Sequence, residues 1–283
     1  LQPERTNASH ATAPMISATS SEPFRIGVVG VDEKSRGLGV IATREIARGE
    51  IVIEECPLLS TSTNRGKKGW ASRLEDQFLA SPPAIQDKIM ALHDAFAQDD
   101  EATKSVRGIF MTNGIENYVV GGSLYEITSR CNHSCRPNAQ FMQNTLLAGC
   151  VKAIQDIEQG DEICISYLGP GCMWPRDRRR QVLQQQYRFK CICEVCTKTR
   201  STESDDRRAK LSRLINKYCR NTDVPGDPEA HEIISECLAA LRLFSEERVA
   251  SPIHECFFYR TLQIACGSLA DSLVDGRVAI ECG

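Results

Sequence analysis

The sequence lacks several features that would place it in a specialised class. It has no apolar run approaching 18 residues, which excludes a membrane-spanning helix. Its start has no charged segment followed by an apolar one, so we expect no secretory signal. Basic residues are not in excess, because 34 Lys and Arg face 37 Asp and Glu and the formal net charge is -3. Nucleic-acid-binding domains are usually strongly basic, so this balance argues against nucleic acid as the main partner.

Cysteine is abundant but unevenly placed. None of the 14 cysteines lies between Cys56 and Cys131, so no cysteine-based zinc module can occupy that segment. In a long chain without a secretory signal, we interpret them as reduced thiols of an intracellular protein with a metal site, in the nucleus or the cytoplasm. Scattered cysteines in apolar contexts are predicted to be small buried hydrophobic residues, namely Cys56, Cys150, Cys164, Cys219, Cys237, Cys256 and Cys266.

Short strands are predicted in two parts of the chain. Residues 1–22 are rich in Ser, Thr, Ala and Pro and are predicted to be a disordered arm. Close turns without intervening helices then indicate an antiparallel or mixed β fold rather than a doubly wound sheet. The predicted strands cover residues 24–31, 38–42, 51–55, 146–153 and 162–167.

Helical spacing marks the remaining regions. Apolar residues from Trp70 onward recur at helical intervals and resume after Pro82-Pro83, which predicts a helical insertion over about residues 60–112. Pro175 is expected at the first position of a later helix. Residues 201–283 are predicted to form a C-terminal helical domain with short links and antiparallel neighbours, and the array can extend beyond the residues given.

Residues 130–141, R-C-N-H-S-C-R-P-N-A-Q-F, are predicted to be a structured loop. Pro137 lacks an N–H and disfavours helical dihedral angles at Arg136. Asparagine and serine side chains bond to nearby backbone, which favours turns. We therefore expect this central loop to use its polar groups for binding.

Three later cysteines have the spacing of a metal site. Cys191, Cys193 and Cys196 form C-x-C-x-x-C, and such closely spaced thiolates suit tetrahedral zinc, which needs four ligands. Cys135 is the predicted fourth ligand, with Cys131 as the second choice. Four thiolates leave no open position, so the predicted role is structural, tying the late segment to the central loop. The alternative is chance crowding of buried cysteines.

Other features are weak when taken one at a time. Gly37-Leu38-Gly39 allows a close backbone approach, although glycines in a turn are ordinary. Asn132-His133 can bond a cofactor, although a single histidine is more often structural. Tyr167 can belong to the core or place its hydroxyl in a pocket.

The order of the motifs resembles that of the SET-domain protein lysine methyltransferases. R-G-L-G comes first, followed by N-H-S-C-x-P-N, G-D-E-I-x-I-S-Y and C-x-C-x-x-C. Y-x-F-x-C-x-C-x-x-C and G-G-S-L-Y are similar to the SET-and-MYND subfamily. The resemblance covers about residues 24–197. The chain departs from that subfamily because its insertion has no cysteines for a MYND module, so MYND-type partner binding is not implied.

The resemblance implies an α+β architecture with a β-rich SET fold over residues 23–168. Short strands would form a knot-like core in which residues 161–167 thread beside the central loop. Residues 169–200 would be a post-SET zinc-binding segment, and the C-terminal helices would be similar in kind to the subfamily's helical-repeat domain.

The resemblance also implies the activity of a protein-lysine N-methyltransferase that uses S-adenosylmethionine. Tyr167 would be the catalytic tyrosine and Tyr187 a second aromatic residue of the lysine channel. The cofactor would be bordered by Arg36, Gly37, Leu38, Gly39, Asn132, His133, Tyr167, Tyr187 and Phe189. One structural zinc ion would be bound by Cys135, Cys191, Cys193 and Cys196.

The partner implied is a protein with a target lysine, histone or not, bound as an added strand by a monomeric enzyme. Neither nucleic acid nor membrane is expected as a partner. Two alternatives stay open. One is a non-catalytic scaffold, although a scaffold needs none of Asn132, His133 and Tyr167. The other is a SET-fold enzyme acting on a small molecule, which would need a wide, apolar pocket.

Overall fold

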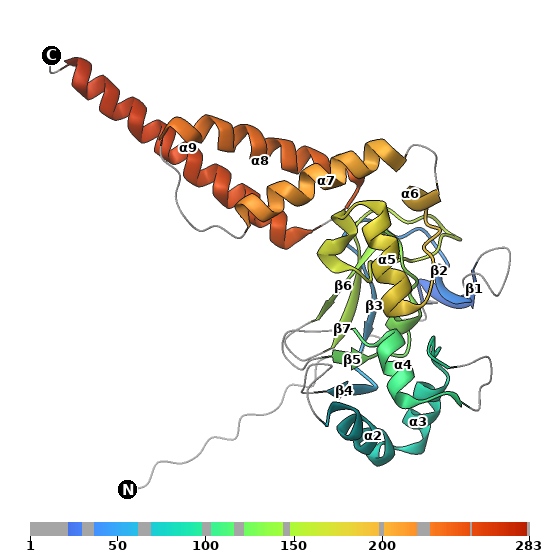
Figure 1. Cartoon of the computed structure of the whole chain (residues 1–283). Helices are drawn as coiled ribbons and strands as arrows, with labels where there is room; N and C mark the ends of the chain where they lie inside the picture. Colours follow the sequence, from blue (N-terminus) through green and yellow to red (C-terminus); the bar gives the residue numbers. More distant parts are fainter. Residues whose placement is uncertain are drawn as a thin grey trace, which may run out of the picture.

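The computed structural model describes residues 22–29, 37–61, 69–97, 103–115, 122–143, 148–197, 201–219, 227–249 and 251–281. The insertion helices lie at one end of the molecule, the strands lie in the middle, and three long helices lie at the other end (Figure 1). The predicted arm falls outside the described residues except for Glu22, and Arg36 is also outside them.

Strand β2 (Leu38–Ala42) is covered along both edges. On one side β1 (Phe24–Val28) pairs with it in antiparallel register. On the other side the Ile163 N–H donates to the Val40 carbonyl at 2.8 Å. Because both edges are paired, β2 tolerates a continuous apolar run, and four of its five residues are buried. β2 thus places the Gly37-Leu38 turn on a rigid support.

Two further antiparallel sheets complete the β region. One has the strand order β3-β7-β6 and the other pairs β4 with β5. β2 and β3 have the predicted bounds. β4 and β5 were not predicted because they have three residues each, and β6 begins inside the segment predicted to be loop. The strands are β3 (Ile51–Glu55), β4 (Leu59–Thr61), β5 (Gly122–Leu124), β6 (Ala139–Gln143) and β7 (Gly149–Ala153).

The prediction of a strand over residues 162–167 is wrong. This segment makes two isolated bridges, one antiparallel between Glu162 and Ile41 and one parallel between Ile165 and His133. Its neighbours change from β2 to the central loop within a few residues, so no continuous ladder can form. The segment is threaded between them, which is the crossing expected of a knot-like core.

Helices occupy the positions where helical spacing predicted them in the insertion, but the second one ends early. Leu92, predicted to continue it, is buried in the turn that follows Met90. The third begins at a capped end, because the Ser105 hydroxyl accepts from the Gly108 N–H at 3.0 Å. The insertion contains α2 (Trp70–Ala80), α3 (Pro83–Met90) and α4 (Val106–Asn113).

Of the remaining helices, one short helix leads into the central loop and the others follow it. Pro175 is the N-cap of the helix over Arg176–Tyr187, one position earlier than predicted. Cys172 and Met173 join the core of the last three helices, which therefore pack directly onto the strand-rich part. None of the described helices is long and apolar enough to cross a membrane. The elements are η2 (Thr128–Arg130), η3 (Gly169–Met173), α5 (Arg176–Tyr187), α6 (Glu194–Thr197), α7 (Ser201–Tyr218), α8 (Asp227–Glu247) and α9 (Pro252–Glu281).

The prediction that the scattered cysteines are buried is correct for some of them and wrong for others. Cys150, Cys164 and Cys237 are buried, and Cys219 is half-buried. The prediction is wrong for three residues that are exposed, namely Cys56, Cys256 and Cys266. An apolar sequence context does not determine which face of a helix a residue occupies, and Cys256 and Cys266 both lie on α9.

Candidate functional site

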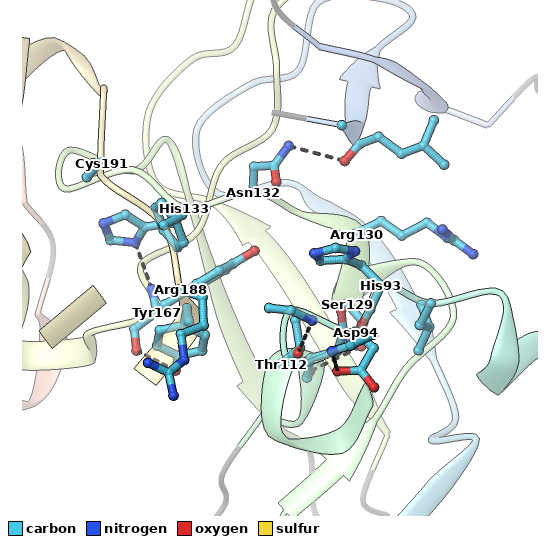
Figure 2. Close-up of a pocket in the computed structure, with 18 of the residues that line it drawn as sticks. His93, Asp94, Thr112, Ser129, Arg130, Asn132, His133, Tyr167, Arg188 and Cys191 are labelled. Carbon is cyan, nitrogen blue, oxygen red and sulfur yellow. Dashed lines mark hydrogen bonds between the residues drawn. The ribbon is translucent and has the colours of Figure 1, made fainter. Parts of the chain in front are cut away.

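A cavity of about 720 Å³ lies between the insertion, the central loop and the segment after α5. Figure 2 shows Tyr167, His133 and Arg188 on one side, with His93, Asp94 and Thr112 on the other. Seven of the nine residues predicted for the cofactor line it, namely Gly37, Leu38, Asn132, His133, Tyr167, Tyr187 and Phe189. Gly39 is not among the lining residues. The individual roles of these residues stay predictions.

The two glycines at the start of β2 have different structural reasons. Gly37 has a φ of 66°, in the left-handed region that favours glycine, and a Cβ there would meet nothing within 4 Å. A Cβ on Gly39 would lie 2.9 Å from both Asn132 Nδ2 and Glu162 Oε1. Gly37 therefore leaves open space beside the cavity, whereas Gly39 permits packing against the central loop.

The Asn132 side chain ties three segments together. Its Nδ2 donates to the Leu38 carbonyl at 3.2 Å (Figure 2). The same Nδ2 donates to Glu162 Oε1 at 2.8 Å. Both amide protons are thus engaged within the protein. We conclude that the Asn132 amide group fixes the cavity wall, whatever part its other atoms take in binding.

Tyr167 lies at the centre of an aromatic group. Its ring centroid is 5.0 Å from that of Tyr187 and 6.3 Å from that of Phe189. Its hydroxyl donates to the Cys131 carbonyl at 2.8 Å. Burial raises the pKa of Tyr167 well above its ordinary value, so the hydroxyl keeps its proton at neutral pH. Tyr167 can therefore orient a neighbour but cannot serve as a base.

Tyr187, the last residue of α5, and Phe189 both line the cavity and lie on either side of a strained turn. Arg188 ends the helix with a φ of 61°, which is uncommon for a residue other than glycine. Its guanidinium carbon lies 5.2 Å from the centroid of the Phe96 ring in the insertion. Such backbone strain is typical of functional sites, where the surrounding structure holds it in place.

His133 joins the cavity to the cysteine cluster. Its Nδ1 accepts from the Tyr167 N–H at 3.0 Å, and its Nε2 lies 3.3 Å from the Cys135 sulfur. The side chain is buried, with only 5% exposed. Both ring nitrogens thus face protein atoms, and the predicted contact of His133 with a cofactor stays a prediction.

The four cysteines predicted as zinc ligands come together. The sulfur atoms of Cys135, Cys191, Cys193 and Cys196 all lie within 4.8 Å of one another and are buried. Cys135 Sγ is 3.9 Å from Cys191 Sγ and 3.7 Å from Cys196 Sγ. Tetrahedral zinc with Zn–S bonds of about 2.3 Å needs sulfur separations of about 3.8 Å, so the group has the size that zinc requires.

Hydrogen bonds among the four sulfur atoms divide the cluster into two kinds of thiol. They lower the pKa of Cys193 well below its ordinary value and that of Cys196 to about 6, whereas the pKa values of Cys135 and Cys191 are raised. The Arg179 guanidinium, fully buried, lies 3.8 Å from Cys196 Sγ. Cys131, the second choice as ligand, lies instead in the core beneath the β-strands.

Sequence reasoning missed the wall that the insertion supplies. Asp94, buried, accepts from the backbone N–H groups of Phe96 at 2.8 Å and of Ser105 at 3.0 Å. It therefore fixes the turn after α3 against the start of α4, beside Thr112 and Asn113. In the sequence, Asp94 indicates at most an Asx turn, in which its carboxylate accepts from the N–H of Phe96 two residues later. That pattern does not indicate the second contact, with Ser105.

Comparison with known proteins adds a family relationship. A protein-family model described as "SET domain" matches residues 37–168. Histone-lysine N-methyltransferase set5 of Schizosaccharomyces pombe is 29% identical over 193 residues, which cover 65% of this chain and 57% of that protein. Protein-lysine N-trimethyltransferase SMYD5 of Gallus gallus is 46% identical over 80 residues, covering 27% of this chain and 19% of that protein.

A third relative matches a share of the chain that lies between those of the first two. Histone-lysine N-methyltransferase SMYD3 of Homo sapiens is 35% identical over 126 residues, covering 44% of this chain and 26% of that protein. The chain thus spans 57% of the yeast relative and 19% and 26% of the two vertebrate proteins.

Proposed function

Because residues 37–168 of this chain are a SET domain, related to those of the SET-and-MYND methyltransferases, we propose that the protein is a protein-lysine N-methyltransferase. It takes the methyl group from S-adenosylmethionine and delivers it to a lysine side chain of a histone or another protein. An intracellular setting, in the nucleus or cytoplasm, and a monomeric enzyme belong to the same proposal.

One observation carries the proposal. The Gly37-Leu38 turn, the Asn132-His133 pair and three aromatic residues from two distant segments line the same cavity. A protein that only bound partners would need no such convergence, and the fold alone does not determine a function. The open space beside Gly37 fits a bulky ligand lying along the backbone.

The residues of the cavity would hold the cofactor at two ends. Gly37 and Leu38 would lie along it through their backbone, and Phe189 would stack on its adenine ring. S-adenosylmethionine supplies an activated methyl group on a sulfonium, whose sulfur becomes a neutral thioether when the methyl leaves. The protein's own task is therefore alignment of the acceptor nitrogen with that methyl group.

The lysine must arrive as a neutral amine. Tyr167 and Tyr187, whose rings are 5.0 Å apart, would form an aromatic channel that disfavours the ammonium form by desolvation. The hydroxyl of Tyr167 stays protonated and is held by the Cys131 carbonyl, so it provides a fixed dipole rather than a proton acceptor. The lysine amine loses its proton to solvent before it enters.

Labelled methyl transfer tests the proposal. The protein is incubated with S-adenosylmethionine labelled in the methyl group, together with histones or a cell extract, and protein-bound label is measured. We expect label on lysine, and none on substrate whose lysines have first been blocked by acetylation, which turns the amine into an amide. Cofactor binding without any protein label contradicts the proposal in favour of a scaffold or a small-molecule enzyme. Absence of cofactor binding contradicts any methyltransferase function.

We further propose that Cys135, Cys191, Cys193 and Cys196 bind one structural zinc ion. Cys135→Ser is expected to lose the metal and to unfold the post-SET segment, because a structural zinc site contributes folding energy directly. Cys131→Ser is the matched control, since Cys131 is also buried but lies in the β core. Metal content by mass spectrometry should fall from one equivalent to below about one half in the first variant and stay at one in the second. Equal metal content in both contradicts the assignment.

A further inference from the structure

The His133 ring bridges the cavity and the sulfur cluster, which also adjoin where Cys191 and Cys193 line the cavity. One nitrogen faces the backbone of Tyr167, which lines the cavity, and the other faces Cys135 of the sulfur cluster. The backbone of His133 is fixed as well, because Ser134 N–H donates to the Ile165 carbonyl at 3.0 Å and Ile165 N–H donates to the Asn132 carbonyl at 3.0 Å. The ring is therefore held in place from both directions.

The hydrogen bonds determine which nitrogen of the neutral ring carries the proton. A backbone N–H can only donate, so Nδ1 must accept from Tyr167 and has no proton. The proton of a neutral imidazole is then on Nε2, which points at the Cys135 sulfur at 3.3 Å. A thiolate bound to a metal is the better acceptor for such an N–H, since charge-assisted bonds are stronger than neutral ones.

From this geometry we infer that His133 is a positioning residue. Through its ring, the sulfur cluster and its metal ion fix the position of Tyr167. The chain of contacts runs from the cluster sulfur of Cys135 to Nε2–H, through the ring to Nδ1, and on to the Tyr167 N–H. It ends at the Tyr167 hydroxyl, which bonds to Cys131. No proton moves along this chain. The inference rests on the proposed zinc site and links it to the proposed methyl-transfer site.

The consequence is that the position of the Cys135 sulfur and the position of Tyr167 in the cavity depend on each other. Moving the Cys135 sulfur moves the acceptor of the Nε2–H bond, and the ring then shifts its contact with Tyr167. The aromatic group allows little independent movement, because the His133 ring lies 5.4 Å from that of Tyr167 and 6.1 Å from that of Phe189. A structural metal that touches no substrate would thus control the geometry of the cavity.

Two amide variants separate the two halves of the contact. In His133→Asn the side-chain carbonyl can replace Nδ1 and accept from Tyr167, but nothing reaches Cys135. In His133→Gln the side-chain NH₂ can replace Nε2 and donate to Cys135, but the acceptor for Tyr167 is lost. Both interrupt the connection, so either one that folds suffices for the test. His231→Asn, on an exposed position of α8, is the matched control.

The position of Tyr167 is followed by fluorine NMR of protein containing 3-fluorotyrosine. The chain has six tyrosines, and Tyr167→Phe identifies the signal. Replacing zinc by the larger Cd²⁺ ion should shift the Tyr167 signal in the parent and in His231→Asn, and by clearly less in His133→Asn and His133→Gln. An equal shift in the His133 variants overturns the inference, as does a parent signal that does not respond.

Metal release to a chelator gives the second readout. We expect about 10- to 100-fold faster release from His133→Asn, the usual effect of losing a group that bonds to a metal ligand. Release from His133→Gln should stay close to that of the parent, and identical rates for both variants overturn the inference. Neither measurement requires methyl transfer, so an inactive enzyme leaves the result interpretable. A protein that binds no metal overturns the inference together with the zinc proposal.

Discussion

Tyr167→Phe is expected to lower methyl transfer about 100-fold while the protein stays folded, because a small loss of alignment at the reacting atoms is enough for such an effect. The substitution removes only the hydroxyl, which donates to the Cys131 carbonyl at 2.8 Å, and keeps the ring contacts with Tyr187 and Phe189. Loss of one hydrogen bond costs about 1 kcal/mol of stability. Single-turnover rates with labelled cofactor would measure the effect on the methyl-transfer step.

Matched variants show whether the effect belongs to the cavity. Tyr218→Phe, on α7, removes the hydroxyl of a tyrosine packed in the C-terminal helical core and is expected to keep the parent rate. Cofactor affinity of Tyr167→Phe should also stay near that of the parent, since the Gly37-Leu38 turn is unaffected. A Tyr167→Phe variant with parental turnover would remove the hydroxyl from the mechanism, and one that lost metal or folding would assign it a structural role.

Local chemistry made the cluster of four cysteines the most predictable part of the molecule. The C-x-C-x-x-C spacing restricts three sulfurs to one turn, and the structure adds Cys135 from the central loop, as predicted. β2 and β3 were predictable for a similar reason, since their β-branched residues lie between clear turns. In each case the information lies within a few consecutive residues.

Side-chain direction was not predictable because it depends on distant segments. The ring nitrogens of His133 contact Tyr167 and Cys135, which no pattern around residue 133 indicated. β6 was hidden because Pro137 and Asn138 immediately precede it and suggested that the loop continued. The role of Asp94 depends on Ser105, whose N–H becomes available only where α4 begins. Such contacts appear only when the chain is folded.

The junction between the C-terminal helices and the central loop contains a buried ion pair that no local pattern suggested. Glu247 and Arg208 are both fully buried, and Arg208 Nε donates to Glu247 Oε2 at 2.9 Å. Arg208 also donates to the Cys135 carbonyl at 3.0 Å and bonds to the Cys172 carbonyl. The other carboxylate oxygen accepts from Arg207 Nε at 2.6 Å. These contacts connect α7 and α8 to the loop that supplies the fourth sulfur.

The charge of Glu247 makes this junction sensitive to acid. Burial by itself would raise the pKa of Glu247, but hydrogen bonds from Ser204 and Arg207 and the charge of Arg208 lower it overall, below the ordinary value of 4.5. A carboxyl whose pKa is lower in the folded state contributes stability that is present above the unfolded pKa and is lost as pH falls through the folded pKa. We therefore expect this contribution to be complete at neutral pH and to decline below about pH 4.5.

Glu247→Leu is accordingly expected to destabilise the protein at pH 7 by about 3–5 kcal/mol, because it leaves Arg208 as an uncompensated buried charge. The double variant Arg208→Met, Glu247→Leu removes both charges, and its free energy of unfolding should lie closer to that of the parent than the single variant's does. Denaturant unfolding at pH 7 and at pH 4 measures both effects, and Glu246→Leu, at the neighbouring exposed position of α8, is the control. Glu247→Leu should also lose stability less steeply with acid than the parent. If the single and double variants are equally unstable, the cost lies in lost packing rather than in the unpaired charge, and the pair does not hold the helices to the central loop electrostatically.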